Sequence, residues 1–184
     1  MLIKHYNIAK GILAYFDKVK KKFFRRKGFN MLESSFALLR EIGILTVNEQ
    51  EEVHFSIDAY HGFRYVSVRR YLKLESGFAG PTRDGVTLTP EIVRALVPML
   101  LALPEDTKQL KLGPIGKFAK RPGICIVVGM AEFRGARGLE MRQWTQDKGF
   151  GKNGIWLPLT HWAEIRKLFA DTLAAIDEVP DIDF

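Results

Sequence analysis

The chain has 184 residues, of which 47% are hydrophobic and 27% charged, a balance typical of a folded globular protein. No apolar run approaches the ~18 residues of a membrane-spanning helix, and the one cysteine, Cys125, excludes a disulfide framework or a Cys-rich zinc site. The net charge of +7 is unevenly spread, because residues 1–30 carry nine Lys or Arg and one acid while residues 31–184 are close to neutral. This asymmetry suggests contact with a polyanion at the basic end.

Residues 1–50 are predicted to form a basic, helical N-terminal segment. Its apolar residues recur in steps of three and four, the period of an amphipathic helix, and are Leu2, Tyr6, Ala9, Leu13, Phe16 and Phe23. The opposite face is rich in lysine and arginine, so it could contact phosphates, attach to an anionic membrane surface, or simply face solvent. A second helix is expected to begin with Asn30 as its cap and to end at Gly43.

Two later segments repeat one pattern. Arg83–Leu88 and Lys152–Leu157 each read basic, Asx, Gly, β-branched, any residue, Leu. In both, the Asx-Gly pair predicts a tight turn into a strand. A helix is expected after each segment, with Thr89 as the cap in the first copy and Thr160 in the second. The sequence therefore predicts the same strand–helix unit twice.

The match between the copies continues upstream. Gly62 precedes Arg69 by seven residues, and Gly135 precedes Arg142 by seven. Between them the side chains alternate, so one face of each strand is predicted to lie under a helix and the other to face solvent. The predicted inward residues are Val66, Val68, Leu139 and Met141.

Together these signals predict an α+β fold of two tandem ββββα repeats, each an antiparallel sheet followed by a C-terminal helix, preceded by N-terminal helices. The repeats are expected at residues 51–103 and 122–177. A connector is expected at 104–121 and an acidic tail at 178–184.

The predicted solvent face of each sheet alternates aromatic rings with basic side chains. A ring can stack on a nucleobase, which contributes about 1–3 kcal/mol per base, and a basic group can hold a phosphate. Duplex DNA hides its base faces, so the pattern favours single strands. The rings could instead seal a dimer interface or the join between the copies. The candidate nucleic-acid-binding residues are Tyr60, Arg64, Tyr65, Arg69, Tyr71, Lys73, Arg83, Phe133, Arg134, Arg137, Arg142, Trp144, Lys148, Phe150, Lys152 and Trp156.

At these residues the chain resembles the Positive Cofactor Four family of transcriptional coactivators and its bacterial and phage relatives. The family signature runs aromatic–basic–Gly, Arg-x-aromatic, a Gly/Lys-rich loop, basic-x-Gly-Ile-x-Leu and a helix. The similar segments are Tyr60–Gly62, Arg69–Tyr71 and Arg83–Gly85 in the first copy, and Phe133–Gly135, Arg142–Trp144 and Lys152–Leu157 in the second.

The resemblance implies a curved four-stranded sheet and a helix in each copy, with the two copies paired within one chain as a pseudo-dimer that binds single-stranded DNA. It implies that Tyr60 and Phe133 stack on bases and that Arg134, Arg83 and Lys152 supply the basic contacts.

The chain departs from the family at one stacking position. The family's tryptophan after Arg-x-aromatic falls on Leu72 and Thr145, neither of which is aromatic. Tyr71 and Trp144, each one residue earlier, are the substitutes we expect.

The C-terminal residues resemble the tips of bacterial and phage single-stranded-DNA-binding proteins, which are acidic and end in an aromatic residue. Asp181, Asp183 and Phe184 are predicted to bind a replication or transcription protein, with the ring in an apolar pocket and the carboxylates on basic residues. The alternative is a frayed acidic terminus.

No catalytic constellation can be found in the sequence, so we expect a protein that is not an enzyme and uses no cofactor or metal. Gly149–Gly154 fits G-x-G-x-x-G but opens no helix, which removes the context that dinucleotide binding requires. The four histidines lack metal-ligand spacing.

The sequence thus predicts sequence-tolerant binding of single-stranded DNA in replication, recombination or transcription, with RNA left open as a ligand. Two alternatives remain: a transcription regulator that acts mainly through polymerase contacts, and a membrane-surface protein anchored by the basic helix. A homo-oligomer is a further expectation. The expected location is the cytoplasm of a bacterial or phage-infected cell, or a nucleus or organelle if the source is eukaryotic.

Overall fold

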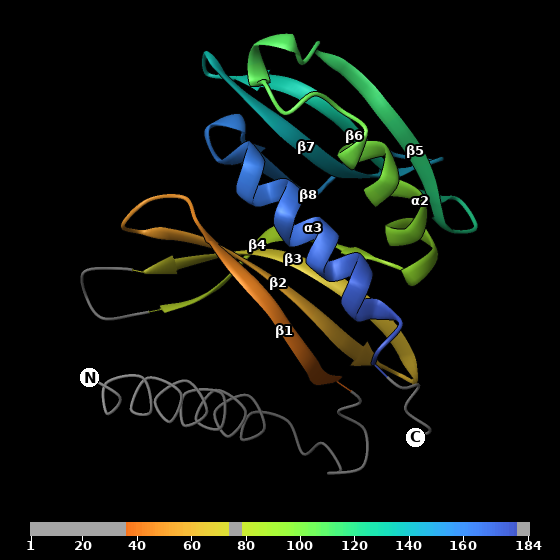
Figure 1. Ribbon diagram of the computed structural model, residues 1–184. Coiled ribbons are helices and arrows are strands. Elements are labelled where there is room, and N and C mark those ends of the chain that lie inside the picture. The colour runs from red at the N-terminus through yellow and green to blue at the C-terminus, as the bar shows by residue number, and fades with distance from the viewer. Residues whose placement is uncertain (1–35, 74–78, 180–184) are drawn as a thin grey trace, which may run out of the picture. The chain divides into compact units, whose positions relative to one another are not determined.

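The computed structural model describes residues 36–73 and 79–179, which form two four-stranded antiparallel sheets and two helices. The elements of the first repeat are β1 (Phe36–Thr46), β2 (Glu51–Tyr60), β3 (Phe63–Lys73), β4 (Ala79–Leu88) and α2 (Pro90–Leu101). Those of the second are β5 (Gly113–Arg121), β6 (Ile124–Phe133), β7 (Ala136–Thr145), β8 (Gly149–Pro158) and α3 (Trp162–Ile176). The strand orders are β1-β2-β3-β4 and β5-β6-β7-β8, which confirms the predicted fold class of two ββββα repeats (Figure 1).

The central hairpin of each sheet turns in the same way. His61 and Gly62 have φ values of 50° and 77°, and Arg134 and Gly135 have φ values of 52° and 77°. Positive φ at both residues is the mark of a two-residue type I′ turn, which matches the twist of the strands that it joins. The aromatic–basic–Gly turns are therefore at corresponding places in both copies.

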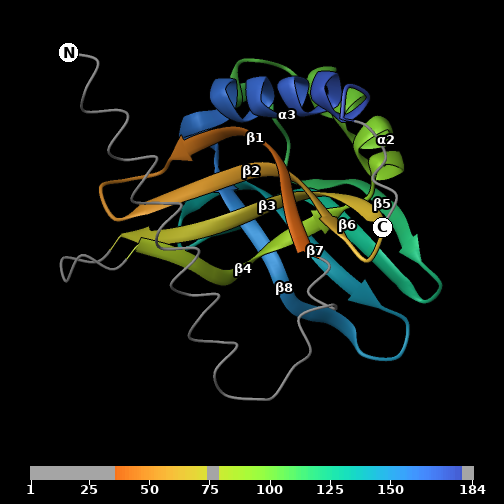
Figure 2. The ribbon, with the colours of Figure 1, turned by 90° about the horizontal axis from the view of Figure 1, so that it is seen from below.

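The alternation predicted for the strands after these turns is confirmed. Val66, Val68, Leu139 and Met141 are fully buried. They belong to one continuous hydrophobic core that includes both sheets and both helices. Figure 2 shows the two helices on one side of the strands, so each sheet keeps an outer face away from them.

The helices are exchanged between the repeats. The sequence predicts that each helix covers its own sheet, but α3 of the second repeat packs on β1 and β2 of the first. Phe169 of α3 meets Phe55 of β2 edge-on, with ring centroids 5.3 Å apart. In turn, α2 contacts β5 of the second sheet as well as β3 of its own. This exchange joins the two repeats into one core.

The prediction of a helix from Asn30 to Gly43 is wrong over its described part, since β1 begins at Phe36. Two β-bulges, between Leu38 and Arg40 and between Glu41 and Gly43, shift the alternation of β1. As a result Leu39, Ile42 and Leu45 all pack toward the core. Their spacing of three residues imitates a helix in the sequence.

Two further local predictions are also wrong. A strand, β5, occupies residues that were expected to be a connector. Gly85 and Gly154 form no tight turn but lie inside β4 and β8. A Cβ on Gly85 would lie 2.8 Å from the Val68 carbonyl oxygen, and one on Gly154 would lie 3.1 Å from that of Met141. These glycines permit a close approach of two backbones.

Candidate nucleic-acid interface

The outer face of the second sheet is the side of β5–β8 that the core does not cover. Cross-strand register brings Trp144 opposite Phe150 and Glu140 opposite Trp156. Lys117 of β5 and Arg142 of β7 flank Val127 on the same face. Aromatic and basic side chains therefore share one surface, as the sequence predicts for this copy.

One end of this surface is built around Trp156. A Cβ placed on Gly138 would lie only 2.3 Å from Trp156 Cε2, so the indole ring lies directly across the glycine. The Phe133 ring stands next to it, with centroids 6.2 Å apart and an interplanar angle of 61°. Phe133 is 57% exposed, and Arg134 lies 5.2 Å from its ring centroid. An exposed ring beside a guanidinium suits a base and its phosphate.

The other end is built around Trp144. Lys117 Nζ lies 3.6 Å from the centroid of the Trp144 ring, a cation–π contact that fixes both groups. Phe150, across the strand pair, is 61% exposed. Lys117 was missed by the sequence analysis because the strand that carries it was predicted to be a connector.

The charge on this face is mostly positive. Arg142 forms an ion pair with Glu140 at 2.7 Å and is itself exposed. Lys148 and Lys152, at the two sides of the Gly-rich β7–β8 hairpin, are also exposed. The second copy therefore brings its predicted basic residues to the surface around the rings, apart from Arg137.

The outer face of the first sheet has a different chemistry. Tyr71 is half-buried and stacks on His54, with centroids 3.9 Å apart. The His54 ring contacts Glu52 at 3.3 Å, and the predicted phosphate ligand Lys73 also bonds to Glu52. Burial raises the pKa of the Tyr71 hydroxyl, and the negative charges of Asp58 and Glu41 add to that shift. This face is of mixed charge, so it suits a polyanion less well than its counterpart.

Asp58 itself is buried among these groups. Its carboxylate accepts a hydrogen bond from Ser56 Oγ at 3.0 Å. Burial raises the pKa of Asp58, although the Ser56 hydrogen bond and the charge of Arg69 act in the opposite direction. A carboxylate in this position opposes the binding of a phosphate to the same face.

At one pair of neighbouring positions, the two copies carry an aromatic ring on opposite strands. In the second copy Gly138 of β7 leaves room for Trp156 of β8. At the equivalent places of the first copy, β3 carries Tyr65 and β4 carries Thr87. Lys120 bonds to the Thr87 hydroxyl and lies 5.9 Å from the Tyr65 ring centroid. Burial lowers the pKa of the Lys120 amine.

Arg64 and Arg137, both predicted to contact nucleic acid, form hydrogen bonds to backbone carbonyls of the chain that follows the helices. Arg64 donates to the Ile176 carbonyl at 3.1 Å and to that of Val179. Arg137 donates to the Thr107 carbonyl at 3.3 Å and to that of Leu110. Both arginines are on the core side of their strands, because Arg64 precedes the buried Val66 by two residues and Arg137 precedes the buried Leu139 by two.

Tyr60, the last residue of β2, and Phe63, the first residue of β3, are exposed rings on either side of the β2–β3 turn, with 50% and 65% exposure. The ring of Tyr60 meets that of His61 edge-on at 4.2 Å. Phe63 was not predicted to bind nucleic acid, because no motif in the sequence distinguishes this ring from an ordinary strand residue after the turn. The most exposed rings of the first copy are therefore at the β2–β3 end of its sheet.

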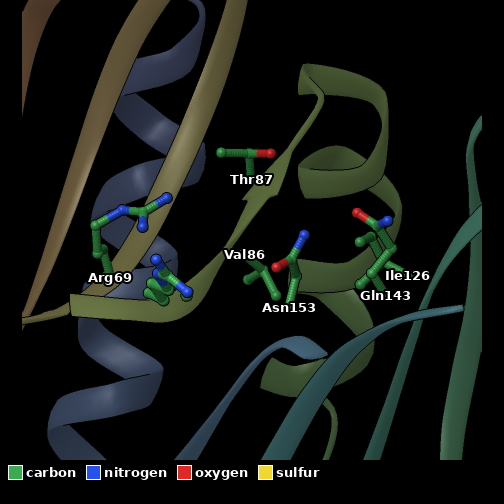
Figure 3. A pocket seen from close by; sticks show the side chains of 8 residues that line it. Arg69, Val86, Thr87, Ile126, Gln143 and Asn153 are labelled. Atoms are coloured by element: carbon green, nitrogen blue, oxygen red, sulfur yellow. The ribbon is translucent and has the colours of Figure 1, made fainter. Parts of the chain in front are cut away.

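The two copies meet at a cavity of about 240 Å³ (Figure 3). Five lining residues come from the first copy, namely Arg69, Arg83, Gly85, Val86 and Thr87. Three come from the second copy, namely Ile126, Gln143 and Asn153. Two predicted phosphate ligands, Arg69 and Arg83, are therefore brought together at the join of the repeats.

Some predicted features lie outside the described residues. They are the tail residues Asp181, Asp183 and Phe184 and the basic N-terminal helix. Within residues 36–73 and 79–179, no helix is long and apolar enough to cross a membrane. No group of three or more His, Cys, Asp or Glu in that part of the chain could hold a metal ion.

Comparisons with known proteins add little to this geometry. No protein-family model matches the chain, and no curated protein matches it in sequence. A solved structure of the plant transcriptional regulator PBF-2 is similar with a TM-score of 0.32 and 4% identity, over 75% of this chain and 88% of that one. That similarity is too low to indicate a function, so the function must be inferred from the residues of the chain itself.

Proposed function

We propose that this protein binds single-stranded DNA with little sequence preference and catalyses no reaction. The outer face of the second sheet is the principal contact. Its rings stack on unpaired bases, while basic side chains around them hold the backbone. The role in the cell is in replication, recombination or transcription.

The arrangement of Lys117, Trp144 and Phe150 is the observation that carries this proposal. An ammonium 3.6 Å from one ring and a second ring that is 61% exposed put positive charge and accessible aromatic area on one surface. Side chains that only seal a core would be buried, and Phe150 is not. Any base can stack on such a ring, because every base has a π-face.

The first sheet contributes less to binding in this proposal. Glu41, Glu52 and Asp58 share its outer face with Tyr71. Repulsion between these carboxylates and a phosphate backbone keeps the strand on the second sheet and at the join of the copies. Arg69 and Arg83 continue the positive surface there.

A titration of fluorescently labelled oligo-dT and of a duplex of equal length tests the proposal. We expect tighter binding of the single strand, and a linear fall of log K with log salt of about 0.7 per phosphate contacted. Lys108→Ala, at an exposed lysine away from the sheets, serves as the control for Lys117→Ala and should leave the affinity unchanged. Equal affinity for both ligands, or binding that salt does not weaken, would contradict the proposal.

A further inference from the structure

The cavity between the repeats has two chemically different ends. Arg69 lies at one end and Gln143 with Ile126 at the other, with Asn153 between them (Figure 3). Its volume of about 240 Å³ is below the ~300–1,000 Å³ of pockets that hold drug-sized ligands. The cavity therefore suits a small group, or one unit of a longer chain that continues outside.

The arginine end is prepared for an anion. Arg69 donates to the Thr82 carbonyl at 3.1 Å, which fixes its guanidinium group in place. Arg83 is exposed, and among the described residues it has neither a hydrogen bond nor an ion pair from its side chain. None of the described residues that line the cavity is acidic. Arg69 also interacts electrostatically with Asp58, but the cavity lining combines two guanidinium groups with no carboxylate, which favours a phosphate.

The amide end has the groups that recognise a base edge. Within the described chain, the side-chain amides of Gln143 and Asn153 have no hydrogen-bond partner. Buried Val86 and Ile126 supply apolar walls that can contact the flat faces of a ring. A side-chain amide offers a donor and an acceptor together, which is the pattern that pairs with adenine.

We infer that the cavity receives one nucleotide of the bound strand, with its phosphate on Arg69 and Arg83 and its base, preferably adenine, on Gln143 and Asn153. The inference rests on the proposed function, since the nucleotide belongs to the strand that the second sheet holds. It adds one position of base preference to an otherwise sequence-tolerant surface. The two copies are both needed for it, because each supplies one end of the cavity.

The test compares a dT strand of about 16 nucleotides, a length within known single-strand site sizes, with the same strand carrying one internal dA. The full chain is titrated with both strands at one salt concentration. We expect the dA strand to bind about fivefold tighter or more. Gln143→Leu should remove that difference. Gln146→Leu, the same change at an exposed glutamine outside the cavity, should keep it.

Asn153→Ala is a second variant of the amide end. Because Asn153 is exposed, this change can be measured even if Gln143→Leu disturbs folding. It should reduce the preference for dA while the affinity for dT stays the same. A preference that survives both changes comes from stacking and overturns the inference. Equal, tight binding of both strands by the unmodified protein also overturns it, while the proposed function stands. Absence of binding to either strand overturns both.

Discussion

Arg64 and Arg137 occupy equivalent positions, each two residues after the turn glycine of its repeat, and each ties down the chain that follows the other repeat's helix. Arg64 holds the carbonyls of Ile176 and Val179 at the end of α3. Arg137 holds those of Thr107 and Leu110 beyond α2. The exchange of helices is therefore fixed by a symmetric pair of charged donors.

Replacing either arginine should lower stability without lowering affinity for DNA. Hydrogen bonds from a charged group contribute about 1.5–3 kcal/mol, so we expect Arg64→Ala and Arg137→Ala each to lower the free energy of unfolding by about that amount. Urea denaturation measures this loss. Arg134→Ala is the matched control, since Arg134 is exposed and should lose affinity for DNA with little change in stability. If Arg64→Ala and Arg137→Ala instead lowered affinity for DNA and left stability unchanged, these arginines would be DNA contacts.

Trp144→Ala should weaken single-strand binding by about 1–3 kcal/mol, the usual value of one stacked base. Tyr71→Ala, at the equivalent residue of the first copy, should have a smaller effect, because acidic groups surround that ring. Titration of both variants with oligo-dT measures the difference. Equal losses would show that both sheets bind the strand, as the sequence predicts.

Asp58 should make the protein more stable at mildly acidic than at neutral pH. Burial raises the pKa of this carboxyl in the folded protein above its usual value of 3.8, so the folded state holds the proton more tightly than the unfolded state. The stability that this proton contributes is present at low pH and is lost as the pH rises through the folded-state pKa.

Asp58→Asn removes that group and should flatten this part of the pH profile. We expect the variant to gain free energy of unfolding at pH 7 relative to pH 4, compared with the unmodified protein, as measured by urea denaturation at both values. Loss of the negative charge should also raise affinity for DNA on the first sheet. A variant with an unchanged pH profile would mean that Asp58 has an ordinary pKa.

The close contact between Gly138 and Trp156 predicts that substitutions at these two positions are energetically coupled. Gly138→Tyr alone should be destabilising, since even a Cβ there would lie 2.3 Å from Trp156 Cε2. Adding Trp156→Thr copies the Tyr65 and Thr87 arrangement of the first repeat and should restore part of the loss, since the Leu157 carbonyl oxygen, 2.7 Å from the same Cβ, stays in place. A double-mutant cycle measures the coupling, expected at about 0.5–3 kcal/mol. Additive effects would mean that the two positions do not share one space.

The sequence predicts the repeated units well because their signals are local. The Gly62 and Gly135 turns and the alternation through Val66 and Leu139 depend only on neighbouring residues. β1 could not be recognised, because two bulges give Leu39, Ile42 and Leu45 the spacing of a helix. The strand identity of β1 is set by its pairing with β2, which the sequence pattern does not record.

The candidate site could be predicted only in part, for a similar reason. Trp144 is found where alternation puts it, on the outer side of the second sheet, and Phe150, which the sequence placed only nearby, lies opposite it. The acidic character of the first sheet's outer face depends on β1 and β2, whose register brings Glu41 and Asp58 near Tyr71. The cavity is lined by residues from 69–87 and 126–153, and a local sequence pattern cannot predict contact between segments so far apart in the chain.

The exchange of α2 and α3 also determines when each sheet can be completed during synthesis. The first sheet is made early, yet the residues that cover β1 and β2 are those of α3, which leaves the ribosome after every described strand. The apolar face of the first sheet therefore stays exposed until the whole second sheet has been synthesised. Cutting the gene between the repeats would therefore separate each half from part of its own cover, and the halves should recover their structure only when they are expressed together.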